Sequence, residues 1–244
     1  MNVIYEPKGR AREYSPLACN LYRGCTHGCK YCYAPACMRT TNAKWCAEAT
    51  PRTNVLTLLE KDAHKLRGDK RDILFCFLSD PYQPLERTAH LTRQALEIVG
   101  YHKLQSQVLT KGCGDLIAED FPLMKKIGTK LGITLSFCDD ASRLEWEPEA
   151  SSVADRLRLL KEAHAQGIFT WVSMEPVIDP EQALQVIRMA HAHVDFWKIG
   201  KLNHNKTVEA GVDWRKFLGD ATALLSRYDA RYLIKEDLAR FASP

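Results

Sequence analysis

Three cysteines lie within one short segment of the sequence and could bind a metal centre together. Cys25, Cys29 and Cys32 have the spacing C-x3-C-x2-C. A cubane iron–sulfur cluster normally takes four cysteine thiolates. Three thiolates at this spacing, with no obvious fourth beside them, predict a cluster with one iron open to a substrate or cofactor. The aromatic residues around Cys32 would give the loop an apolar wall.

Two other interpretations of these cysteines remain open. A structural zinc site needs four ligands in tetrahedral geometry, and Cys19 or His27 could supply the fourth. Zinc sites more often pair two C-x2-C halves a dozen or more residues apart, and no second half follows here. A disulfide framework is less favoured, because nine cysteines is an odd number and no secretory segment precedes them.

The sequence around the cysteines resembles the signature of the radical S-adenosylmethionine (SAM) enzymes. The string from Tyr22-Arg-Gly-Cys25 through Cys32-Tyr33-Ala34 is similar, more narrowly, to the branch related to spore photoproduct lyase. The resemblance implies a [4Fe-4S] cluster whose open iron is chelated by the amino and carboxylate groups of SAM. One electron from the reduced cluster would cleave the sulfonium, and the resulting 5′-deoxyadenosyl radical would abstract hydrogen from a substrate. A reducing flavodoxin or ferredoxin is the implied partner.

Length and composition predict one globular unit. The chain has 244 residues, of which 45% are hydrophobic and 26% charged, as is ordinary for such proteins. The net charge of +4 permits a polyanionic substrate without requiring one. Basic residues on predicted helices, Arg156 and Arg158 among them, are expected on solvated faces. Residues 1–14 lack the apolar segment of a signal peptide, and the longest apolar run, 73–78, is too short to span a bilayer. We therefore expect a cytoplasmic protein without membrane insertion, in agreement with its unpaired cysteines.

Short apolar runs alternate with amphipathic segments along the chain, which favours a parallel sheet. About six βα units follow from this alternation. The predicted strands are 17–23, 73–78, 107–110, 133–138, 168–175 and 194–200. They fit an α/β fold, the incomplete (βα)6 TIM-like barrel that the resemblance implies. We expect a single domain over 1–244, with a core of about 15–205 and a C-terminal extension of helix and strand over 206–244.

Polar residues follow these predicted strands, where the active sites of such barrels are built. Ser79 and Asp80 could accept hydrogen bonds from the ammonium group of SAM. Lys111 could bind its carboxylate, and Ser136 could bond its ribose hydroxyls. This set is similar to the SAM-binding pattern of the spore photoproduct lyase branch. Ordinary capping or strand-end solvation is the alternative for the serines and the aspartate.

Four further residues are candidates for contact with adenine or substrate. The resemblance implies that Tyr31 packs near the adenine and that Tyr33 lies near the reacting centre, where it could relay a hydrogen atom. Simple packing of the loop is the alternative for both tyrosines. Because side chains alternate along a strand, Glu175 and Cys138 are expected to face the barrel lumen. There Glu175 could orient a substrate and Cys138 could donate hydrogen.

The sequence departs from spore photoproduct lyase at the hydrogen donor. The lyase carries a cysteine two residues before the strand-end serine, and this chain has Phe77 there. Cys76 is one residue away, so it should face the opposite side and pack in the core. We therefore predict a radical SAM enzyme that acts on a nucleobase or a modified thymine in DNA by lyase or isomerase chemistry. The alternatives are a radical SAM enzyme that acts on a peptide or small metabolite, and a zinc-stabilised, non-enzymatic binding module.

Overall fold

A computed structural model describes residues 2–203 and 205–242. Its largest element is an open sheet of eight strands in the order β1-β2-β5-β6-β7-β8-β9-β10. All neighbouring strands in it are parallel except β1 and β2, which are antiparallel. The strands are β1 (Ile4–Tyr5), β2 (Leu17–Cys19), β5 (Ile73–Phe75), β6 (Ser106–Thr110), β7 (Lys130–Thr134), β8 (Thr170–Val177), β9 (Phe196–Lys201) and β10 (Tyr232–Ile234). The predicted α/β class is confirmed.

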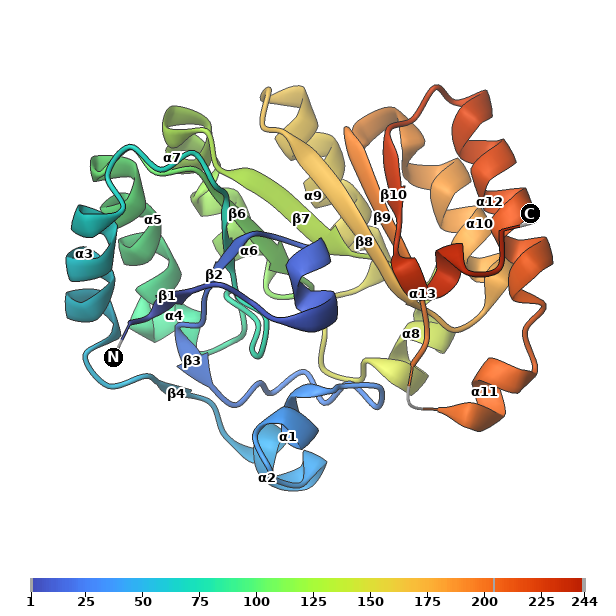
Figure 1. The fold of residues 1–244 in the computed structure, drawn as a ribbon, viewed down its shortest axis with the longest axis horizontal. Coiled ribbons are helices and arrows are strands. Elements are labelled where there is room, and N and C mark those ends of the chain that lie inside the picture. The colour runs from blue at the N-terminus through green and yellow to red at the C-terminus, as the bar shows by residue number, and fades with distance from the viewer. Residues whose placement is uncertain (1, 204, 243–244) are drawn as a thin grey trace.

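The longer helices cover one face of this sheet (Figure 1). They are α3 (Val55–Lys65), α5 (Leu91–Tyr101), α6 (Gly114–Glu119), α7 (Phe121–Ile127), α9 (Val153–Ala165), α10 (Pro180–Ala190) and α12 (Trp214–Arg227). Each turns an apolar side toward the strands, and together they enclose the main hydrophobic core. Capping fixes where they begin: Ser152 Oγ accepts a hydrogen bond of 3.1 Å from the amide of Asp155, as expected at a helix start.

Short elements gather at the carboxyl ends of the strands, below the sheet in Figure 1. They include a two-stranded sheet of β3 and β4. These elements are β3 (Tyr22–Arg23), α1 (Ala34–Cys37), α2 (Asn42–Ala47), β4 (Thr50–Pro51), α4 (Glu86–Ala89), α8 (Asp140–Trp146) and α11 (Lys206–Ala210). The other face of the sheet receives the N-terminal segment with η1 (Gly9–Glu13), drawn in blue in front of the strands. The site residues therefore lie between these segments and the sheet.

Each of the six predicted strands is present, with different bounds. The strand expected over 17–23 is divided into β2 and β3 at Asn20, whose Oδ1 accepts hydrogen bonds from the amides of Phe77 and Leu78. The strand expected over 133–138 begins earlier and ends at Thr134.

The sheet also extends beyond the predicted core at its C-terminal side. Strand β10 pairs in parallel with β9, with Tyr232 opposite Trp197. The segment expected as an extension thus adds a strand to the same sheet, and α13 (Glu236–Ala239) packs after it. Among the described residues, no helix combines the length and the apolar character needed to cross a bilayer.

Candidate active site

The loop with the three cysteines lies between β3 and α1. Its first residues contact α2 and the residue that follows it. Gly24 has a φ of +78°, and a Cβ there would come within 2.0 Å of the carbonyl oxygen of Glu48. Only glycine permits this close approach of two backbone segments. The amide of Cys25 donates a hydrogen bond of 3.3 Å to the carbonyl of Trp45 on α2. The path of the cysteine loop is thus fixed by its contact with α2.

The three thiols of this loop are a donor set that fits an iron–sulfur cluster. Burial raises the pKa of Cys29 to about 12, opposed by the nearby Lys111 ammonium and reinforced by Cys32. Burial also raises the pKa of Cys25, to which Asp80 and Cys29 add. The cysteines are thus close enough to influence one another, and binding iron would deprotonate them. In residues 2–203 and 205–242 as they stand, no three His, Cys, Asp or Glu side chains already have the arrangement of a metal-ion site.

Asp80, after β5, connects the cysteine loop to the end of β6. Its Oδ2 lies 3.2 Å from Nε2 of His27 in the loop and accepts a 2.8 Å hydrogen bond from the amide of Lys111. Its Oδ1 accepts hydrogen bonds from Thr110 Oγ1 at 2.6 Å and from the amide of Tyr82 at 2.8 Å. Burial would raise the pKa of Asp80, but His27, Thr110 and Lys111 outweigh it and lower the pKa to about 2. Both oxygens of the carboxylate expected to bind the SAM ammonium are therefore already engaged within the protein.

Two other expected SAM ligands, Lys111 after β6 and Ser136 after β7, have side-chain polar groups without a hydrogen-bond partner among the described residues. Ser136 is fully buried, and its Oγ has no hydrogen-bond partner among the described residues. The Lys111 ammonium lies 5.7 Å from the centroid of the Tyr31 ring. Burial lowers the pKa of Lys111, but Cys29 and Glu147 outweigh this effect and raise it. A buried hydroxyl and an ammonium thus lie beside the cysteine loop where a polar ligand could satisfy them.

Ser79 and Tyr31 are the two remaining residues expected to contact SAM. Ser79 is buried, and its Oγ donates a long hydrogen bond of 3.5 Å to the carbonyl of Tyr22. Tyr31 packs in a small apolar cluster with Phe137. Phe137 lies beyond the end of β7, so strand alternation does not set its direction. The structure therefore brings Tyr31 together with the end of β7.

Tyr31 is hydrogen-bonded to a buried ion pair that was not predicted from the sequence. The Tyr31 hydroxyl donates a hydrogen bond to Glu147 Oε1, and Glu147 Oε2 lies 2.6 Å from Arg156 Nη1. Glu147 is completely buried and Arg156 is 1% exposed. The prediction of a solvated Arg156 was wrong.

The spacing along α9 contained the information that places Arg156 in the interior. It lies three residues after buried Val153 and four before buried Leu160, and therefore on the apolar face of the helix. Its Nη1 also donates a hydrogen bond of 3.1 Å to the carbonyl of Thr134 at the end of β7. The composition of α9 could not show that Glu147 provides the countercharge for Arg156.

Glu175 lies on the face of the sheet opposite the helices, as alternation along β8 predicted. The hydroxyl of Tyr14, from the N-terminal segment, lies 2.8 Å from Ser173 Oγ and donates a hydrogen bond to Glu175 Oε2. Lys235 Nζ lies 2.9 Å and 2.6 Å from the two carboxylate oxygens of Glu175. The carboxylate is thus part of a network from both ends of the chain. Neither Tyr14 nor Lys235 was identified from the sequence.

The next strand contributes a lysine to this inner face. Lys198 Nζ lies 4.7 Å from the centroid of the Trp171 ring and donates a hydrogen bond of 2.5 Å to the carbonyl of Tyr14. Trp197 packs in the core on the helix side. Lys198 therefore occupies the inner face, and its neighbour Trp197 does not.

The remaining two candidates, Tyr33 and Cys138, have different environments. Tyr33 is 45% exposed, and its hydroxyl donates a hydrogen bond of 2.8 Å to the carbonyl of Phe77. Cys138 packs against the core shared with the helices, and its amide donates to Gln182 Oε1 of α10 at 2.7 Å. The alternation that was expected to turn Cys138 into the lumen fails because β7 ends at Thr134. Cys76 is buried in the core, as expected.

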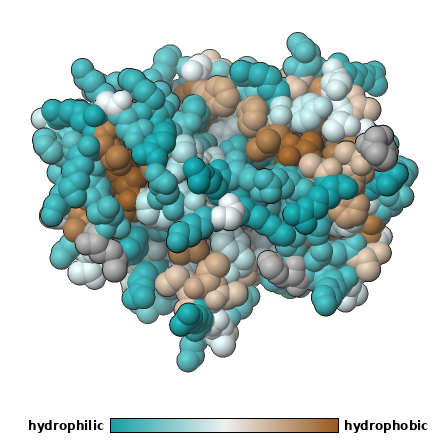
Figure 2. Space-filling view, in the orientation of Figure 1, coloured by the Kyte–Doolittle hydropathy of each residue, from teal (hydrophilic) through white to brown (hydrophobic). Residues whose placement is uncertain are grey.

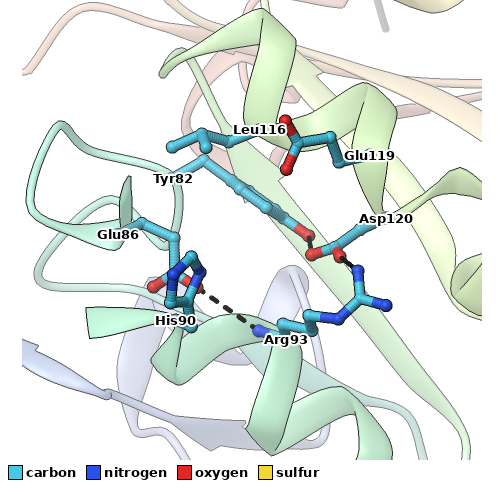
Figure 3. A pocket seen from close by; sticks show the side chains of 7 residues that line it. All are labelled: Tyr82, Glu86, His90, Arg93, Leu116, Glu119 and Asp120. Atoms are coloured by element: carbon cyan, nitrogen blue, oxygen red, sulfur yellow. Dashed lines mark hydrogen bonds and ion pairs between the residues drawn. The ribbon is translucent and has the colours of Figure 1, made fainter. Parts of the chain in front are cut away.

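A small polar pocket of about 20 Å³ lies elsewhere, between α4, α5 and the helices after β6 (Figure 3). Within it, Asp120 accepts hydrogen bonds from the Tyr82 hydroxyl at 2.9 Å and from Arg93 Nη1 at 2.7 Å. Its volume suits one or two water molecules. The hydrogen bonds across the pocket therefore link the helices around it, and the pocket is too small for a substrate. Its lining residues are Tyr82, Glu86, His90, Arg93, Leu116, Glu119 and Asp120.

Solved structures share this architecture. A variant of spore photoproduct lyase matches with a TM-score of 0.71 and 11% identity, covering 94% of this chain and 79% of that chain. The lyase complexed with dinucleoside spore photoproduct matches with a TM-score of 0.69, also at 11% identity over the same shares. This chain has the radical SAM fold. Streptococcus suis SuiB bound to S-adenosylmethionine matches at a TM-score of 0.66 and 10% identity, covering 91% of this chain and 51% of SuiB. The incomplete barrel predicted for the radical SAM fold is confirmed.

The sequence relatives of this chain are uncharacterized proteins and do not indicate its function. The chain is 30% identical over 161 residues to an uncharacterized protein of Methanocaldococcus jannaschii, covering 65% of this chain and 59% of that protein. It is 23% identical over 167 residues to an uncharacterized protein of Mycobacterium tuberculosis, covering 65% and 48%. The chain thus spans about half the length of the curated relatives it matches. No family model matches the chain.

Proposed function

We propose that this chain is a radical SAM enzyme. The observation that carries the proposal is the position of Lys111, whose ammonium lies near the Tyr31 ring and acts on the pKa of Cys29 in the cysteine loop. In the radical SAM fold this places a cation beside three thiols at the carboxyl ends of parallel strands. A bound [4Fe-4S] cluster with SAM would supply a 5′-deoxyadenosyl radical by one-electron cleavage.

The residues around the loop have complementary roles in this proposal. Cys25, Cys29 and Cys32 would hold the cluster. Lys111 would bind the carboxylate of SAM, and the unpaired Ser136 hydroxyl would bond a ribose hydroxyl. Ser79 would accept a hydrogen bond from the ammonium group, and Tyr31 would pack near the adenine. Asp80, with both oxygens engaged, would position the loop rather than bind SAM.

We further propose a nucleobase, for example a modified thymine in DNA, as the substrate. Support comes from the lyase complex with dinucleoside spore photoproduct, whose fold this chain shares over 94% of its length. Half-exposed Tyr33 would contact the substrate and could relay a hydrogen atom. Glu175 would orient polar groups of the substrate through the Tyr14 network.

The positions of the cysteines favour a reaction without a cysteine hydrogen donor. Cys76 is buried in the core, and Cys138 packs against the same core. An isomerisation or rearrangement, in which the abstracted hydrogen is returned to the product, fits this arrangement better than repair by a cysteine donor. Lyase chemistry would need Tyr33 or Cys138 to deliver hydrogen.

Anaerobic purification and reconstitution test the proposal. The enzyme should be brown, contain about four irons per chain, and release 5′-deoxyadenosine on addition of dithionite and SAM. The Cys29→Ala variant should lose iron and activity together. Tightly held zinc without 5′-deoxyadenosine would instead support the zinc-stabilised binding module. Dinucleoside spore photoproduct, followed by mass spectrometry, tests the substrate, and turnover of peptides alone would contradict a nucleobase.

A further inference from the structure

The excess positive charge of this chain is concentrated in one segment. Residues 20–53, which contain the cysteine loop, α1 and α2, carry five basic side chains and one acidic side chain, Glu48. The whole chain carries 34 basic and 30 acidic residues, so 29 of each remain outside this segment. The net charge of +4 therefore belongs to the part of the chain around the three cysteines. The rest of the chain is neutral in sum.

Four of these cations are exposed and form no ion pair with any residue that the structure describes. They are Arg23, Lys30, Arg39 and Lys44, and we call them the basic face. Some exposed cations elsewhere are compensated: Arg71, Arg87 and Arg158, for example, each contact a carboxylate at 2.6 Å. An uncompensated group of like charges produces a positive potential that attracts an acidic partner over a distance.

The basic face belongs to the same segment as the cysteine loop. Helix α1 begins two residues after Cys32, and the amide of Cys25 is hydrogen-bonded to the carbonyl of Trp45 on α2. Helices α1 and α2 project from the body of the molecule (Figure 1). Figure 2 shows weakly hydrophobic residues beside hydrophilic ones over this projection. The exposed apolar positions are small side chains such as Ala36 and Ala43, which permit close approach of a partner.

We propose that the basic face is the docking surface for a small acidic electron-transfer protein. The inference rests on the proposed function, which needs a one-electron donor. On docking, the reduced flavin or iron–sulfur group of the donor loses one electron, and the cluster in the cysteine loop gains it. Weak redox encounters use small interfaces, and complementary charge mainly accelerates their association.

The residue types favour an acidic protein over nucleic acid at this surface. Surfaces that bind single strands interleave basic residues with exposed aromatic rings on which bases stack. Helices α1 and α2 contain one aromatic residue, Trp45, and it is buried. The only exposed ring in residues 20–53 is that of Tyr33, which is 45% exposed, so this segment presents no series of rings for stacked bases. A protein surface rich in carboxylates needs no such rings.

Binding of a purified flavodoxin tests the docking surface directly. Calorimetry at low and at high salt should show binding to the holoenzyme that weakens as salt screens the charges. The R39E/K44E variant should lose about tenfold or more in affinity at low salt, because two attractive charges become repulsive. The K125E/K126E variant on α7 makes the same change in net charge at exposed positions far along the sheet, and it should keep the affinity within about twofold. Equal losses in the two variants would overturn the proposal.

Kinetics separate failure of the docking surface from failure of the proposed function. Flavodoxin-driven formation of 5′-deoxyadenosine should fall in R39E/K44E, whereas the dithionite-driven rate should be unchanged, since dithionite needs no docking. An enzyme inert with dithionite would refute the proposed function, while the binding measurement would still decide the docking surface. Loss of binding to a DNA duplex without loss of flavodoxin binding would assign the face to nucleic acid and overturn the inference. Thermal melts of both variants should match that of the parent.

Discussion

Arg156 Nη1 lies 2.6 Å from Glu147 Oε2 in an ion pair that is sealed from solvent. Glu147 in turn accepts the hydrogen bond of Tyr31, the residue before Cys32 in the cysteine loop. Burial would raise the pKa of Glu147, but Arg156, Lys111 and Tyr31 outweigh it and lower the pKa. A charge pair between Arg156 on α9 and Glu147, the residue that follows α8, thus positions an aromatic wall of the candidate site. Its presence leads to the first of four predictions.

Arg156→Met should destabilise the protein by about 3–5 kcal/mol, because it leaves the Glu147 carboxylate buried without a countercharge. The double variant Glu147→Gln/Arg156→Met should recover much of this loss, since no buried charge remains. Urea unfolding measures both. Arg158→Met, at an exposed ion pair on the same helix, is the matched control and should cost less than about 1 kcal/mol. A double variant as unstable as Arg156→Met would contradict the explanation.

Ser136→Ala should separate stability from ligand binding. The Ser136 hydroxyl is buried without a partner, so its removal should leave the free energy of unfolding of the ligand-free protein unchanged or slightly increased. The affinity for SAM should fall by about three- to tenfold, because one hydrogen bond to ribose is lost. Calorimetry with SAM and urea unfolding give the two quantities. A substantial loss of stability with unchanged SAM affinity would assign Ser136 a purely structural role.

Lys111→Ala should weaken SAM binding by about tenfold or more, because a charge-assisted hydrogen bond to the carboxylate is lost. Its backbone amide, which binds Asp80, is retained in the variant. Lys125→Ala, an exposed lysine on α7, provides the comparison and should bind SAM normally. Calorimetry measures both, and unchanged affinity in Lys111→Ala would remove this residue from the SAM site.

Acid should weaken the fold through Asp80. Its folded-state pKa of about 2 lies below the ordinary value of 3.8, so its stabilising contribution is complete above pH of about 4 and is lost as the pH falls toward 2. The contribution is about 2 kcal/mol. The free energy of unfolding of the ligand-free protein should therefore depend on pH more steeply between 4 and 2 than that of Asp80→Asn. Identical pH profiles would show that Asp80 is not stabilised as described.

Several features of the site could be predicted from local sequence. The cysteine spacing identified the loop, and the period of two along β8 placed Glu175 on the inner face, because alternation holds within a regular strand. The same reasoning failed at Cys138, which lies beyond the point where β7 ends. Strand ends depend on packing with neighbouring segments, which a local pattern does not contain.

The sequence by itself determined the parallel α/β class and the positions of the six predicted strands along the chain, since these follow from residue type and periodicity. Only the tertiary structure decided which charges are compensated. Lys235 reaches Glu175 across 60 residues, and Tyr14 reaches it across 161. Arg156 became an interior residue only through the countercharge of Glu147, which follows the end of α8. Electrostatic pairing acts through space, so partners distant in the sequence are fixed by the fold alone.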